Sequence, residues 1–72
     1  MKVSHIDLEK IEEKIREMRH HRLRYIEKRD DYRTAYATGW IDALIWVLKL
    51  AGEGGDLIML ADTILKKEVR EE

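Results

Sequence analysis

The feature that most restricts the fold of this chain is a mostly apolar stripe with unbroken heptad spacing. Its members recur alternately three and four residues apart from Leu8 to Leu50. A repeat of about 3.5 residues holds one stripe of an α-helix against a partner helix, and no strand-like alternation is present. The pattern therefore predicts an all-α protein. The stripe comprises Leu8, Ile11, Ile15, Met18, Arg22, Tyr25, Arg29, Tyr32, Tyr36, Gly39, Ala43, Trp46 and Leu50.

The continuous register favours one long helix over about residues 5–51, with a kink at 30–31 at most. Ser4 is its expected N-cap. Two helices hinged at Asp30 and Asp31 are the alternative, because either aspartate could cap a new helix.

The glycines at 52, 54 and 55 should end the long helix. Asp56 should then cap a short antiparallel helix over about residues 56–70. The chain, residues 1–72, is expected to be a single helical domain packed as an oligomeric helical bundle or coiled coil.

The amino-acid composition indicates which chemistry, source and cellular location to expect. There is no cysteine, so neither a disulfide nor a thiolate metal site can form. The chain also lacks Asn, Gln and Pro, while 40% of its residues are charged. This pattern indicates a thermophilic source, with chance in a short chain as the alternative. The first ten residues do not resemble a signal peptide, and residues 40–51 are too short to span a bilayer. We expect a cytoplasmic protein without membrane contact.

The segment from residue 32 to residue 51 is apolar around most of its helical circumference. A helix of this kind is normally buried on all sides, and one short C-terminal helix cannot cover two faces. We therefore expect a homodimer or homotetramer. Small residues at every fourth position, Ala35, Gly39 and Ala43, would let helices approach closely. The predicted oligomer interface comprises Tyr32, Tyr36, Gly39, Trp40, Ala43, Leu44, Trp46, Val47 and Leu50.

The middle of the chain is basic, with eight Lys/Arg against four Asp/Glu between residues 14 and 33. Charged residues in a seam set register, contact a ligand or face solvent. Interleaved Arg and Tyr could bind phosphates or stack bases, whereas the alternative is a solvated region of paired arginines. Replacing Arg22 and Arg29 with leucine should extend the seam and raise stability. The candidate partner or ligand contacts are Arg19, Arg22, Arg24, Tyr25, Arg29 and Arg33.

Nothing in the sequence points to catalysis. The only serine, Ser4, is needed as a cap, and no pair of acids lies on an apolar face that would raise a pKa. Glu17 with His20 or His21 could hold a metal at an oligomer axis, but histidines in an arginine-rich helix are usually solvated. We expect no enzyme, no metal and no cofactor.

Residues 36–48 read YATGWIDALIWVL. This string resembles an aromatic-x-x-Gly-aromatic-x-x-Ala-Leu pattern in small helical-hairpin accessory proteins of phages and mobile elements. It is similar to anti-defence proteins that sequester cyclic-nucleotide signals and assemble as oligomers. The resemblance implies the second half of a helical hairpin and an oligomer, and it carries over no ligand residues. The usual break between the hairpin's two helices is missing from this sequence unless Asp30 and Asp31 supply it.

These patterns together predict a non-enzymatic, homo-oligomeric helical interaction module. Such a protein could be a mobile-element accessory or an inhibitor that binds a protein partner. The alternative is a nucleic-acid or nucleotide-binding protein that uses the basic Arg/Tyr middle of the chain. The net charge of −1 argues against a general nucleic-acid binder.

Overall fold

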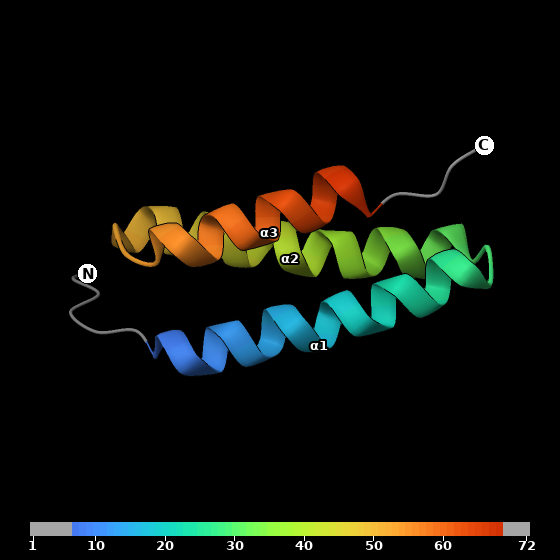
Figure 1. Cartoon of the computed structure of the whole chain (residues 1–72), viewed down its shortest axis with the longest axis horizontal. Helices are drawn as coiled ribbons and strands as arrows, with labels where there is room; N and C mark the ends of the chain where they lie inside the picture. The colour runs from blue at the N-terminus through green and yellow to red at the C-terminus, as the bar shows by residue number, and fades with distance from the viewer. Residues whose placement is uncertain (1–6, 69–72) are drawn as a thin grey trace.

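The computed structural model describes residues 7–68 and contains three helices within that range. Helix α1 (Leu8–Glu27) and helix α2 (Asp31–Ala51) run antiparallel, and α3 (Gly55–Lys67) turns back along α2 (Figure 1). Helix α2 packs against both neighbours, whereas α1 and α3 touch each other little. The predicted all-α class is confirmed, and the described residues include no strand.

The chain reverses direction between α1 and α2, so the predicted single helix over about residues 5–51 is wrong. Arg29 takes a left-handed conformation with φ of 58°. The Asp30 carboxylate then caps α2 by accepting a hydrogen bond from the backbone nitrogen of Arg33 at 3.0 Å. The alternative of two helices is the one observed. A continuous helix would have been about 70 Å long, whereas the longest extent of the bundle is 42 Å.

Aspartate also defines the start of α1. The Asp7 side chain accepts a hydrogen bond from the backbone nitrogen of Lys10 at 3.2 Å, which makes Asp7 the N-cap. A carboxylate in this place pairs a free backbone N–H and interacts favourably with the helix dipole. The expected cap, Ser4, lies outside the described residues.

Glycines form the connection between α2 and α3. Gly52 ends α2 with φ of 70°, as the sequence predicts, and Gly54 precedes α3 with φ of 71°. Because α3 begins at Gly55, Asp56 lies in its first turn and does not cap it, contrary to the prediction. Residues 69 and 70 of the predicted helix lie outside the described range.

The core lies where α2 meets α1 and α3. The buried positions of α2 follow the helical period at 37, 41, 45 and 48, and Ile15, Ile41 and Leu48 have no measurable exposure. This buried stripe of α2 is not the heptad stripe. The core of the bundle, formed by all three helices, consists of Ile15, Met18, Ala37, Ile41, Ile45, Leu48, Ala61 and Ile64. Within residues 7–68, no helix combines the length and apolar character needed to cross a membrane.

Two glycine substitutions form a matched pair. Both Gly52 and Gly54 have positive φ, so alanine should cost about 1–2 kcal/mol at either position. Only at Gly54 would the added Cβ meet other atoms, at 2.8 Å from Leu48 Cδ2 and 3.3 Å from Leu8 Cδ2. Gly54→Ala should therefore lower the free energy of unfolding by about 1–3 kcal/mol more than Gly52→Ala, as measured by urea denaturation. Equal losses would show that the leucines move aside without cost.

Candidate interaction surface on helix α2

The turn between α1 and α2 divides the heptad stripe between the inside and the outside of the bundle. In α1, the stripe residues Ile15 and Met18 are buried. In α2, the stripe faces solvent, with exposed fractions of 85% for Tyr32, 64% for Trp46 and 68% for Leu50. Helices α1 and α3 pack on the opposite side of α2, where the core residues lie. The heptad spacing is thus continuous in the sequence, but its residues face the core on α1 and the solvent on α2.

The predicted oligomer interface maps largely onto this exposed side of α2. Leu44 and Val47 are half-buried, and Leu44 packs against the core. We call the remaining residues the α2 face. The α2 face consists of Tyr32, Tyr36, Gly39, Trp40, Ala43, Trp46 and Leu50, all of them exposed.

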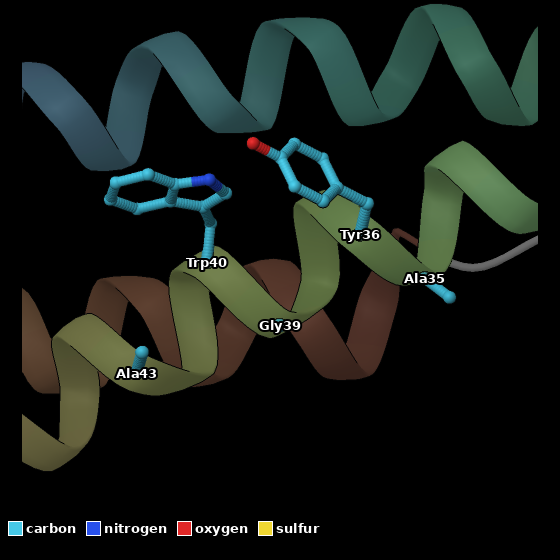
Figure 2. Close-up of a pocket in the computed structure, with 5 residues that line it drawn as sticks. All are labelled: Ala35, Tyr36, Gly39, Trp40 and Ala43. Atoms are coloured by element: carbon cyan, nitrogen blue, oxygen red, sulfur yellow. The ribbon is translucent and has the colours of Figure 1, made fainter.

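A shallow hollow lies in the middle of the α2 face. Figure 2 shows the rings of Tyr36 and Trp40 rising from the same side of the helix, whereas Ala35, Gly39 and Ala43 leave the rest of the hollow open. Apart from the adjoining residues and the backbone of α2 itself, no atom lies within 4 Å of the place where a Cβ of Gly39 would be. A side chain from another molecule could therefore reach the α2 backbone here.

Trp40 is fixed at one edge of the hollow by α1. The Nζ atom of Lys14 lies 4.9 Å from the centroid of the Trp40 ring, which is a cation–π contact. The same Nζ atom pairs with the Glu17 carboxylate at 2.9 Å. The aromatic wall of the hollow is thus held in place within a single chain.

The candidate basic contacts do not form one surface, because Arg22 lies inside the bundle with 4% exposure. Its Nε donates to Thr38 Oγ1 at 2.7 Å, and its Nη1 donates to the carbonyls of Ile64, at 3.5 Å, and Glu68. Carbonyls at the end of a helix have no partner within that helix. Arg22 therefore joins α1 to α2 and completes the end of α3, so we remove it from the candidate surface.

Burial lowers the pKa of the Arg22 guanidinium, and the nearby Glu68 carboxylate partly offsets that effect. Glu68 also pairs with Arg19, whose Nη2 lies 2.6 Å from Glu68 Oε2. Hydrogen bonding to this carboxylate raises the pKa of Arg19. Because the usual pKa of an arginine side chain lies far above neutrality, both arginines carry a charge. Together they hold the C-terminal end of α3 against α1.

The other candidates gather near the turn. The Tyr25 ring stacks on His21 with centroids 6.2 Å apart and packs against the core. Arg24, Arg29 and Arg33 are exposed, and Arg33 Nε lies 3.6 Å from Asp30 Oδ2. Three arginines at one end of the hairpin are what remains of the predicted basic surface.

The histidines that the sequence offers as metal ligands lie on the exposed side of α1. The rings of His20 and His21 are 6.1 Å apart at an angle of 60°. The hydrogen bond from Lys14 lowers the pKa of Glu17. Among residues 7–68, no three side chains of metal-binding type come together.

Comparison with known proteins assigns no family to this chain. No protein-family model matches it, and neither curated proteins nor solved structures give a significant match. The resemblance of residues 36–48 to helical-hairpin accessory proteins stays a prediction. As a matter of geometry, α1 and α2 form a helical hairpin, and residues 36–48 lie in its second helix.

Sequence reasoning missed the acceptors of Arg22. Thr38 and Glu68 lie 16 and 46 residues away in the chain, so no local spacing connects them to it. The only available signal was general: a charged residue inside an apolar seam needs polar partners if it is buried.

The position of Arg22 reverses the expectation that leucine there raises stability. Arg22→Leu would leave the Glu68 carbonyl and the Thr38 hydroxyl without their donor, which should cost about 1–3 kcal/mol in urea denaturation. Backbone amides in the last turn of α3 should also exchange faster with solvent. Arg24→Leu, at an exposed position on the same helix, is the control and should change stability by about 0.5 kcal/mol or less. An Arg22→Leu variant as stable as the original chain would contradict this role.

Proposed function

We propose that this protein is a non-enzymatic interaction module that self-associates through the α2 face and binds a protein partner. One observation carries the proposal: most of the large hydrophobic side chains that are exposed in the described chain lie on α2. Soluble proteins rarely leave a contiguous apolar patch uncovered unless it binds something. A chain of 72 residues also gains stability by completing its core with a second copy.

The chemistry of the α2 face suits packing better than it suits catalysis. Its side chains are aromatic, aliphatic or small, and aromatic residues are enriched where proteins meet. Trp46 is the natural anchor, since tryptophans often contribute most to the binding free energy of an interface. Gly39 and Ala43 supply the small positions into which a partner's side chains can pack.

With the α2 face covered, the hairpin end that carries Arg24, Arg29 and Arg33 is the surface offered to a partner. The proposed role as a mobile-element accessory or inhibitor draws on the resemblance of residues 36–48 and on no other observation. A nucleic acid or nucleotide is the other candidate ligand for the three arginines. Phosphate contacts weaken steeply with added salt, so a pulldown from lysate at two salt concentrations, with and without nuclease, distinguishes the two partners.

Self-association is tested by the mass of the protein in solution. Sedimentation or light scattering at micromolar concentration should give at least a dimer. Trp46→Glu should yield a monomer with unchanged helix content, because a carboxylate would be buried in the contact without a partner. Met59→Glu replaces an equally exposed apolar residue on α3 and should leave the dimer intact. A stable monomer of 8.6 kDa with a cooperative melt would refute the proposal.

Gly39→Leu separates the folding of one chain from its association. Leucine is the better helix former by up to about 1 kcal/mol, and the site has room within a single chain. If a second helix approaches at Gly39, the added side chain must push it away, at about 1–3 kcal/mol. We expect a higher melting temperature in dilute solution together with weaker association. Unchanged association would place Gly39 outside the contact.

A further inference from the structure

We infer that two copies of α2 pair antiparallel, so that Ala43 of each copy lies opposite Trp46 of the other and Asp42 lies beside the partner's Lys49. This inference rests on the proposed function: it takes a second copy as the occupant of the α2 face and adds the orientation and the register. Charge, side-chain size and symmetry support it independently.

The charges beside the stripe are self-complementary. In the heptad pattern, Asp42 and Lys49 flank the α2 face on the same side, two turns apart. Both are exposed, and neither forms an ion pair within residues 7–68. When a second α2 runs antiparallel along this flank, Asp42 of each copy lies beside Lys49 of the other. A two-fold axis makes this contact occur twice. A second copy therefore supplies two Asp42–Lys49 pairs.

In the second half of the stripe, two small residues, Gly39 and Ala43, are followed by two large ones, Trp46 and Leu50, and this order fits the same register. With Ala43 opposite the partner's Trp46, Gly39 lies opposite the partner's Leu50. Trp46 and Leu50 then each meet a small residue, which fills space without forcing the backbones apart. Tyr32 and Tyr36 lie beyond the paired segment, because α2 ends at Ala51. On the other flank, Trp40 lies beside the partner's Val47, so an apolar edge meets an apolar edge. One register thus satisfies the charges and the packing together.

The competing arrangements each leave a conflict. An antiparallel pair with Gly39 opposite the partner's Ala43 brings Asp42 against the partner's Asp42, and facing like charges oppose association. A parallel pair places Trp46 against the partner's Trp46 and Gly39 against the partner's Gly39. Two large side chains would then compete for the same space, while the two glycines would leave a gap between the helices. It also leaves Asp42 and Lys49 without an opposite charge.

The chain contains no cysteine, so single cysteines report the register without background. A disulfide needs Cα atoms within about 7 Å. Chains carrying Asp42→Cys, mixed with chains carrying Lys49→Cys, should form a disulfide-linked heterodimer under mild oxidation, while each variant alone stays unlinked. One native Asp42–Lys49 pair survives in that heterodimer. Self-linked Asp42→Cys would establish the competing antiparallel register, and self-linked Tyr36→Cys the parallel pair; either result overturns the inference.

Charge reversal tests the same contact without oxidation. Lys49→Glu should weaken association roughly tenfold or more, because it faces the partner's Asp42 twice. Lys10→Glu makes the same change in net charge at an exposed position on α1 and should have little effect. Asp42→Lys combined with Lys49→Glu restores both pairs and should recover association. Failure of that recovery would count against the register.

The outcomes separate this inference from the proposal on which it rests. If the unmodified protein is a dimer but links or responds in another pattern, the orientation is wrong and self-association stands. If the dimer forms no link in any of these mixtures, the register is wrong, and the effect of Trp46→Glu on the mass decides whether α2 pairs at all. If the unmodified protein is a monomer, both fail.

Discussion

The backbone reversal at Arg29 and Asp30 is the constraint on which the other contacts depend. A non-glycine residue at positive φ is strained by about 1–2 kcal/mol, and the Asp30 cap on α2 offsets part of that strain. Because the reversal folds α1 back along α2, Ile15 can reach the buried side of α2. The same reversal turns Tyr32 and Trp46 outward. A different turn length would rotate α2 and exchange its buried and exposed sides.

Helix α3 depends on a second, polar constraint. It touches α1 little, yet Arg22 and Arg19 reach from α1 to its C-terminal end and hold Glu68 by its carbonyl and its carboxylate. Burying a guanidinium is costly unless its donors are paired, and here Thr38 and the carbonyls of α3 pair them. The end of the third helix is thus located by directional hydrogen bonds, whereas its middle is located by apolar packing through Ala61 and Ile64.

The class of the fold could be predicted because helical periodicity and glycine conformation are local properties of the chain. The end of α2 at Gly52 followed from the same reasoning. The turn could not be predicted with the same force, because a straight helix and a hairpin with one outward stripe satisfy the same heptad spacing. Asp30 is compatible with a continuous helix as well as with the start of a new one. The left-handed conformation of Arg29 has no distinctive sequence signature. The partners of Arg22 were out of reach because they are distant in sequence.

Both tryptophans of the chain, Trp40 and Trp46, lie on the exposed side of α2 and not in the core. Within a single chain the emission of Trp46 is therefore a poor measure of unfolding, whereas Trp40, which is 36% exposed and contacts Lys14 of α1, still responds to it. The emission of Trp46 reports chiefly what covers α2, whereas circular dichroism reports whether the helices exist. The molecule thus carries two separate optical signals, one for its environment and one for its backbone, without any attached dye.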